Sequence, residues 1–148
     1  KGETLLDVGC NSGYILIELL KHNNLGKSLG IDQSDDMLSI PRKICELTNI
    51  DLDFKVCDIF SEEFKDLDEF DHISILSVFG YPRDFEAAID QNGTKSRKSI
   101  IIEPKNHEGF SKEKTFEYWL REFDKYGDVK LLGFTDYQDR GLFQILVR

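Results

Sequence analysis

Short apolar segments alternate with longer amphipathic segments along most of the chain. The short ones run through several apolar residues or alternate apolar with polar residues, as strands do, whereas the longer ones repeat apolar residues every three or four positions, as helices do. Asn, Gly and Pro residues separate the segments. We predict strands at residues 3–8, 27–32, 53–57, 70–78 and 99–102, and helices at residues 12–22, 34–47, 82–92 and 111–126.

The C-terminal segment departs from this alternation. Residues 129–134 and 142–147 have strand patterns, and the segment TDYQDRG between them is too short to hold a crossover helix. The two strands should therefore pair directly as antiparallel neighbours. The whole pattern predicts a three-layer α/β fold in a single domain over residues 1–148, with an open, mostly parallel sheet that ends in an antiparallel hairpin.

The loop after the first predicted strand, in the stretch LLDVGCNSGY, is nearly bare of large side chains. Gly9 and Gly13 bracket Cys10, Asn11 and Ser12. Glycines permit unusual backbone angles and the close approach of a ligand, and amides at the start of the following helix can face an electronegative group. In an open parallel sheet, ligands bind at the carboxyl ends of the strands, where this loop lies. The loop therefore predicts a cradle for a nucleotide cofactor.

Two acids end the next two predicted strands. Asp32 lies at the distance from the glycine loop where a nucleoside site places an acid that binds ribose hydroxyls. Asp58 is placed to accept a hydrogen bond from the amine of adenine, and Met37 can lie on an adenine face. Each residue also has a structural interpretation, in which the acids cap helices or turns and Met37 belongs to the core. Their order at successive strand ends favours the cofactor site.

The segments LLDVGCNSG, GIDQSDDML, VCDIF and FDHISILSVF resemble the successive motifs of the class I S-adenosylmethionine-dependent methyltransferases. The resemblance covers nearly the whole chain, including the terminal hairpin of their seven-stranded Rossmann-like sheet. It implies that S-adenosyl-L-methionine is the cofactor. The residues implied for its site are Asp7, Gly9, Cys10, Asn11 and Gly13 for the methionine part, Asp32 with Gln33 beside it for the ribose, Met37, Asp58 and Ile59 for adenine, and Ser77 near the amino acid moiety.

Two departures from the family pattern affect the expected site. Asn11 stands where the family often has a glycine, so we expect it to adopt a left-handed conformation or to add a hydrogen bond of its own. Almost nothing precedes Glu3, whereas the family usually has helices there that close over the cofactor. Either this fragment lacks those lid helices, or the site is an open one.

A nicotinamide dinucleotide site is the rival use of such a loop. That site requires G-x-G-x-x-G, and the sequence from Gly9 has glycine only at the first and fifth places. The antiparallel ending disfavours an oxidoreductase further.

Candidates for proton transfer lie at the ends of the fourth and fifth predicted strands. Methyl transfer depends mainly on alignment and exclusion of water, and it needs a base only if the acceptor must lose a proton. Tyr81, Glu103 and His107 are the candidates, and histidine has the ordinary pKa that suits a base. In the structural alternative, His107 is an ordinary loop residue and Glu103 caps a helix or pairs with Lys105.

The charge balance narrows the class of acceptor. A net charge of -9 disfavours nucleic acid, and the segment SVFGYP lacks the D/N-P-P-Y/F motif of nucleic-acid amino methyltransferases. The basic segment KSRK at residues 95–98 is interpreted as a solvated loop. We predict a small-molecule or glycan acceptor that is methylated at oxygen. The segment QDRGLFQIL distantly resembles the tails of some sugar and glycan methyltransferases, and this resemblance implies that Arg140 meets an anionic acceptor. In the alternative, Arg140 pairs with Asp136 or Asp139 on the surface.

The remaining features favour a cytoplasmic protein without a metal site. The three cysteines lack metal-type spacing, and neither a membrane span nor a signal peptide is seen. Two other functions stay open. One is a non-catalytic scaffold or subunit whose open site is closed by a partner or by a second copy in a homodimer, and the other is a nucleic-acid or protein methyltransferase.

Overall fold

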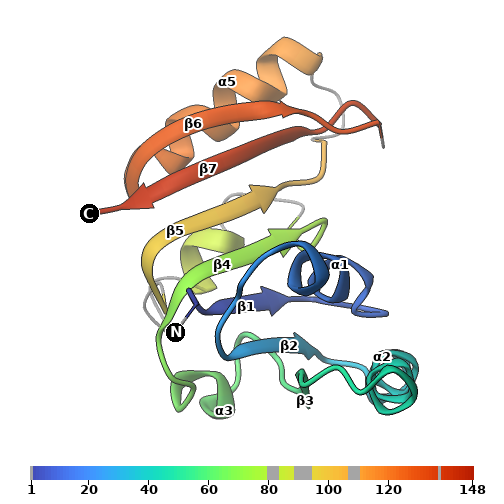
Figure 1. Cartoon of the computed structure of the whole chain (residues 1–148). Coiled ribbons are helices and arrows are strands. Elements are labelled where there is room, and N and C mark those ends of the chain that lie inside the picture. The colour runs from blue at the N-terminus through green and yellow to red at the C-terminus, as the bar shows by residue number, and fades with distance from the viewer. Residues whose placement is uncertain (1, 80–83, 89–94, 107–110, 137) are drawn as a thin grey trace.

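The computed structural model describes residues 2–79, 84–88, 95–106, 111–136 and 138–148. Its strands lie in one seven-stranded sheet, with the outer strands from the middle and the end of the chain (Figure 1). The strands are β1 Leu5–Val8, β2 Ser28–Asp32, β3 Asp53–Val56, β4 Phe70–Leu76, β5 Ser96–Glu103, β6 Gly127–Phe134 and β7 Gly141–Val147.

The sheet has the order β3-β2-β1-β4-β5-β7-β6. Strands β1 to β5 are parallel to one another, whereas β7 is antiparallel to both β5 and β6. The predicted α/β fold, with a mostly parallel sheet and an antiparallel C-terminal hairpin, is confirmed. The carboxyl ends of the five parallel strands consequently lie together at one end of the sheet, which we call its carboxyl edge. The turn between β6 and β7 lies at this same end (Figure 1).

The described helices connect these strands. They are α1 Tyr14–His22, α2 Asp35–Thr48, α3 Glu62–Lys65 and α5 Lys112–Phe123, and residues 84–88 are helical as well. The rest of the helix predicted at residues 82–92 lies outside the described residues. The sequence pattern does not predict α3, because four residues are too few for a periodic signal; it begins after Ser61, whose hydroxyl accepts a hydrogen bond from Phe64 N at 3.3 Å.

One face of the sheet is apolar and packs against α5. Val8, Ile31, Ile75, Ile102 and Phe143 lie side by side across the strands on this face. The ring of Phe143 packs in turn against the fully buried Phe123 of α5, with 5.4 Å between the ring centroids. Aromatic packing thus joins the C-terminal hairpin to the core.

The opposite face is covered by α1 and α2, and it is more polar. Asp7, Gly30 and Phe54 lie in register on this face. A Cβ added at Gly13, which precedes α1, would lie 2.6 Å from Pro41 Cβ of α2 and 2.8 Å from Phe54 Cε1. The glycine therefore lets both helices approach the sheet closely.

An apolar stripe with helical spacing lies on the exposed side of α2. Its members Met37, Ile40, Ile44 and Leu47 are 43%, 52%, 38% and 71% exposed, whereas Leu38, Pro41 and Cys45 of the same helix are buried. The helix thus carries two apolar stripes that lie side by side on its surface, because each residue of the buried stripe directly follows a residue of the exposed one. Periodicity alone cannot choose between them, because the choice depends on contacts with the sheet and with Gly13.

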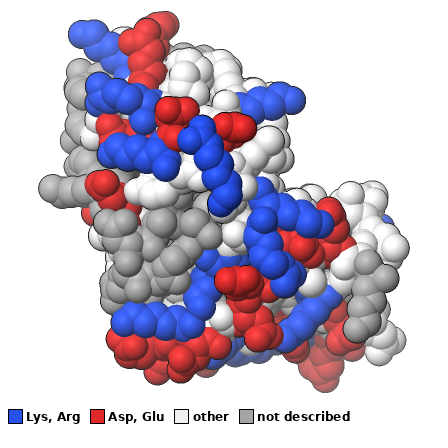
Figure 2. All heavy atoms as spheres, turned by 90° about the vertical axis from the view of Figure 1, so that its left-hand side faces the viewer, with Lys and Arg blue, Asp and Glu red and all other residues white. Residues whose placement is uncertain are grey.

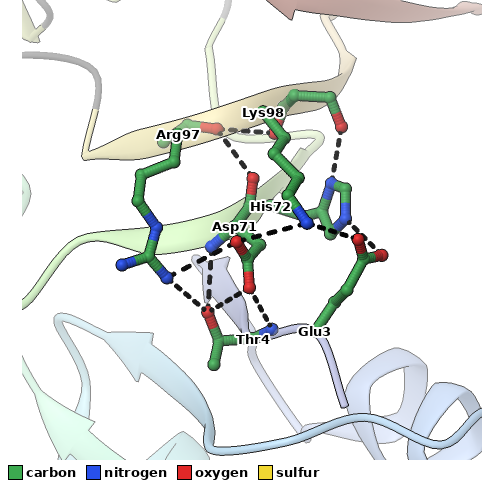
Figure 3. A network of polar contacts seen from close by, with 8 residues as sticks. Glu3, Thr4, Asp71, His72, Arg97 and Lys98 are labelled. Carbon is green, nitrogen blue, oxygen red and sulfur yellow. Dashed lines mark hydrogen bonds and ion pairs between the residues drawn. The ribbon is translucent and has the colours of Figure 1, made fainter. Parts of the chain in front are cut away.

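A network of charged and polar side chains lies at the opposite edge of the sheet, where the parallel strands begin (Figure 3). Lys98 Nζ is 3.5 Å from Asp71 Oδ1 and also donates to Glu3, and Arg97 Nη2 is 3.5 Å from Asp71 Oδ1. His72 bridges this network, with Nε2 2.9 Å from Glu3 Oε2. The network ties the segment before β1 to β4 and β5.

This network overturns the interpretation of KSRK as a solvated loop. Strand β5 begins at Ser96, and Lys95 Nζ donates to the carbonyl oxygen of Leu67 at 3.0 Å. On this edge of the molecule, lysine and arginine side chains alternate with aspartate and glutamate (Figure 2). The basic residues of the segment thus have acidic or carbonyl partners and do not form a uniformly positive patch.

Among the described residues, no helix is both long and apolar enough to cross a membrane.

Asp7 is a carboxylic acid in the interior of the sheet. It is only 4% exposed, and its Oδ1 accepts a hydrogen bond from Ser74 Oγ at 2.6 Å. Burial disfavours the charged form and raises the pKa of Asp7 from 3.8 to about 6, although the hydrogen bond from Ser74 opposes the shift. Since its pKa is higher in the folded state, the folded protein binds this proton more tightly than the unfolded chain does.

The raised pKa of Asp7 predicts a pH dependence of stability. Its contribution is fully present below about pH 4 and is lost as the pH rises through about 6. We expect the unfolding free energy of the wild type, relative to that of Asp7→Asn, to fall by about 2 kcal/mol between pH 4 and pH 7.5. Urea denaturation at a series of pH values measures this difference. The exposed Asp35→Asn is the matched control, and parallel profiles for wild type and Asp7→Asn would contradict the prediction.

Candidate functional site

A hollow of about 470 Å³ opens at the carboxyl edge of the sheet, and we call it the large hollow. Gly9 and Asp32, from the ends of β1 and β2, line it together with Asp58 after β3 and Ser77 after β4. These residues are far apart in the sequence. The parallel arrangement brings them together, as expected for residues that follow parallel strands.

The glycine loop is held in a left-handed conformation at three points. Gly9, Asn11 and Gly13 have φ values of 69°, 51° and 67°. Asn11 therefore adopts the left-handed conformation expected of it. A Cβ added at Gly9 would lie 2.5 Å from Val78 Cγ2, so only glycine fits here without displacing the turn after β4. The loop is bare because neighbouring elements approach its backbone from both sides.

Asp32 connects the glycine loop to the start of α2. Its Oδ2 accepts a hydrogen bond from Asn11 N at 3.0 Å, and its Oδ1 accepts one from Ser34 N at 3.0 Å. These two amides orient the carboxylate at the lip of the large hollow. Each carboxylate oxygen can accept more than one hydrogen bond, so the group can also receive two hydroxyl groups of a ligand. Gln33 lines the same hollow.

The segment after β3 forms the far wall of the large hollow. Asp58 and Ile59 line it, and Asp58 Oδ1 accepts a hydrogen bond from Phe60 N at 2.9 Å. Phe60 also lines it and is 43% exposed, although sequence reasoning did not single it out. Phe60 could have been found from the sequence, because it directly follows Asp58 and Ile59 in the segment VCDIF. Met37 is not among the described lining residues and lies in the first turn of α2.

A second hollow of about 330 Å³ adjoins the large hollow at Gly9, and we call it the small hollow. Asp7, Cys10 and Asn11 line it, and Gly9, Ser77 and Val78 line both hollows. Burial, followed by the nearby charges of Asp7 and Asp32, raises the pKa of the Cys10 thiol to about 12. Cys10 is therefore a protonated structural thiol and no nucleophile at neutral pH.

Glu103 and Arg140 form a buried pair beside the turn after β4. Arg140 Nη1 lies 3.4 Å from Glu103 Oε1, and their side chains are only 7% and 10% exposed. Arg140 therefore lies inside the protein beside Glu103 and not on the surface. The Ser77 hydroxyl donates to the same Glu103 oxygen at 2.8 Å. Glu103 thus serves as an acceptor for two neighbours within the protein.

Two of the three proton-transfer candidates, Tyr81 and His107, lie outside the described residues. Within the described part of the chain, the large hollow also contains Asp84 and Lys105, which come from the segments after β4 and β5. No group of metal-ligating side chains occurs among the described residues. The described site therefore consists of a bare backbone loop, several carboxylates and apolar walls, which suits a large organic ligand better than a metal ion.

Comparison with known proteins identifies this arrangement. A family model described as a methyltransferase domain matches residues 1–122. The bifunctional kinase-methyltransferase WbdD has a similar structure, with a TM-score of 0.76 and 20% identity over 98% of this chain and 35% of that one. Magnesium protoporphyrin IX methyltransferase from Synechocystis, solved with bound S-adenosylmethionine, has a TM-score of 0.72 and 14% identity over 99% of this chain and 71% of that one.

A curated relative is similar over a shorter region. The protein-lysine N-methyltransferase EFM4 of Saccharomyces cerevisiae is 34% identical over 64 residues, which are 42% of this chain and 28% of that protein. The chain thus matches only about a third of the length of WbdD and less of EFM4. The family match extends from β1 through most of α5, and the sheet order agrees with it. The chain therefore belongs to the methyltransferase domain family, and it has the Rossmann-like fold of the similar methyltransferase structures.

Proposed function

We propose that S-adenosylmethionine binds across Gly9, with its nucleoside in the large hollow and its methionine part in the small hollow. The orientation of Asp32 is the observation that carries this proposal. Backbone amides hold both of its oxygens at the lip of the large hollow, where ribose hydroxyls can donate to them. Gln33 lies beside the same ribose position.

The walls of the large hollow suit adenine. Asp58 offers a carboxylate to the exocyclic amine, and the backbone of Ile59 offers further contacts along the same edge of the base. Phe60 provides an aromatic face in this wall. Met37, at the exposed start of α2, stays a proposed contact on the outer face of the base.

The small hollow suits the amino acid end of the cofactor. Gly9, Cys10 and Asn11 line it without large side chains, Gly13 ends the same loop, and Ser77 lines the hollow from the turn after β4. Asp7 lies at its base, with a pKa of about 6. A ligand ammonium nearby favours the ionised form of this acid, so cofactor binding should lower the pKa of Asp7.

Catalysis on this proposal consists mainly of positioning. When bound, the cofactor supplies a methyl group activated by a sulfonium sulfur. Ser77 and Val78 lie where the two hollows meet, so they help to fix the direction from which an acceptor can approach. Because Glu103 is already bonded to Ser77 and Arg140, we do not assign it the role of base. His107 and Tyr81 stay the proposed proton acceptors.

The charge of the site favours a neutral or cationic acceptor. Asp32, Asp58 and Asp84 line the large hollow with Lys105, and the whole chain carries a net charge of -9. An anionic acceptor would be repelled by this field. We therefore propose a hydroxyl group of a neutral small molecule or glycan as the acceptor. A lysine side chain of a protein is the second candidate, because EFM4 is a protein-lysine N-methyltransferase and the acidic hollow attracts an ammonium group.

Substitution of Asp32 tests the cofactor site. Asp32→Ala should weaken S-adenosylhomocysteine binding about 100-fold or more, because it removes the acceptor of two hydroxyl hydrogen bonds. Isothermal titration calorimetry measures the affinity. Asp35→Ala is the matched control, since it removes an exposed carboxylate three residues away that pairs with Arg42 at 2.6 Å. Equal affinities for the two variants would contradict the assignment of Asp32.

Transfer of a labelled methyl group tests the acceptor class. The protein is incubated with S-adenosylmethionine labelled in the methyl group and with neutral glycans, hydroxylated small molecules or lysine peptides in separate reactions. We expect label on a hydroxyl acceptor, and none with Asp32→Ala. Label on lysine peptides alone would show that the acceptor is a protein lysine and not a hydroxyl group. Phosphorylated forms of the same acceptors are tested in parallel, and a preference for them would contradict the electrostatic argument.

A further inference from the structure

A buried polar cluster joins the turn between β6 and β7 to the ends of β4 and β5. Arg140 Nη1 donates to Ser77 Oγ at 2.8 Å and to Glu103 Oε1 at 3.4 Å, while Nη2 donates to Gln138 Oε1 at 2.7 Å. Arg140 is only 6% exposed and Glu103 only 8%. One guanidinium therefore connects three segments that are remote in the sequence.

The turn that carries Arg140 is itself held in place. Gln138 and Asp139 have φ values of 58° and 52°, a succession of left-handed residues that is typical of a tight hairpin turn. Thr135 N donates to Arg140 O at 2.9 Å, and Asn106 Nδ2 donates to Gln138 O at 2.7 Å. The position of the guanidinium is thus fixed by its own turn and by the segment after β5.

The turn after β4 has an uncommon backbone conformation. Ser77 has a φ of 61°, which is uncommon for a residue other than glycine and persists where the surroundings hold it. Its N donates to Glu103 O at 2.9 Å, and its hydroxyl donates to Glu103 Oε1. Arg140 adds a hydrogen bond to the same hydroxyl. The cluster therefore holds Ser77 through both its backbone and its side chain.

The turn after β4 packs against the glycine loop, so its position affects that loop. Val78 follows Ser77, and its Cγ2 would lie only 2.5 Å from a Cβ placed on Gly9. Gly9, Ser77 and Val78 are also the residues shared by the two hollows. A shift of the turn would therefore change the width of the crevice where the two hollows meet.

We propose that Arg140 is a positioning residue of the cofactor crevice, which it shapes by holding the Ser77–Val78 turn against Gly9. The proposal rests on the proposed function, in which the cofactor crosses Gly9. A buried ion pair is seldom more stabilising than apolar residues of the same volume, so its presence beside the crevice favours a geometric role. Because its side chain is 7% exposed and bonded within the protein, Arg140 is not placed to meet an anionic acceptor.

Affinity for S-adenosylhomocysteine tests this role. Arg140 is buried and is not among the residues that line the two hollows, so a folded Arg140 variant should lose affinity only if the crevice changes. Arg140→Gln and Ser77→Ala should each weaken binding about tenfold. The double variant should bind no more weakly than the weaker single variant, because both residues act through one turn. Arg140→Lys keeps the charge and should recover part of the affinity. Calorimetry gives Kd, and thermal unfolding shows that each variant is folded.

Arg148→Gln is the matched control, since it breaks an exposed ion pair with Asp128 in the same hairpin and should leave Kd unchanged. A folded Arg140→Gln with a lowered Tm and the wild-type Kd would overturn the proposal, because Arg140 would then only anchor the hairpin. If Arg140→Gln does not fold, Ser77→Ala and Gln138→Ala keep both charged residues of the buried pair, and wild-type affinity in both would overturn it. A wild type that does not bind S-adenosylhomocysteine would instead contradict the proposed function.

Discussion

The close approach of backbone and side chains around the loop after β1 is the constraint on which the site depends. Val78 from the turn after β4 lies against Gly9. Gly13 lies against Pro41 of α2 and Phe54 of β3. Any side chain at either glycine would separate these elements. The loop is therefore bare because four parts of the fold meet there. The same bareness leaves the backbone open toward the crevice, so packing and ligand binding impose one requirement on the sequence.

Polar groups around this loop are fixed mainly by partners in the protein. Asp32 is oriented by two backbone amides, and Asp7 is buried beside Ser74. Ser77 is held by Glu103 and Arg140. A site whose groups are already oriented loses less conformational freedom when a ligand binds. The C-terminal hairpin contributes to this order through Arg140, although its strands lie at the far end of the sheet from β2 and β3.

Features that depend on neighbours in the sequence were predictable, whereas those that depend on distant contacts were not. The strands, the glycine loop, the acid that ends β2 and the acid after β3 follow from local patterns, and the left-handed Asn11 follows from its place in the loop. The sequence does not decide which stripe of α2 is buried, because Pro41 meets Gly13 only in the folded chain. The Glu103–Arg140 pair joins separate strands and has no local signal. Tyr81 and His107 lie outside the described residues, so their roles stay predictions.

The central claim is that one cofactor crosses Gly9 from the large hollow to the small one. A crystal structure of the complex with S-adenosylhomocysteine tests it most directly. We expect ribose hydroxyls within hydrogen-bond distance of Asp32, adenine between Asp58 and Phe60, and the amino acid end beside Ser77. A ligand bound elsewhere, or one whose ribose lies away from Asp32, would contradict the account.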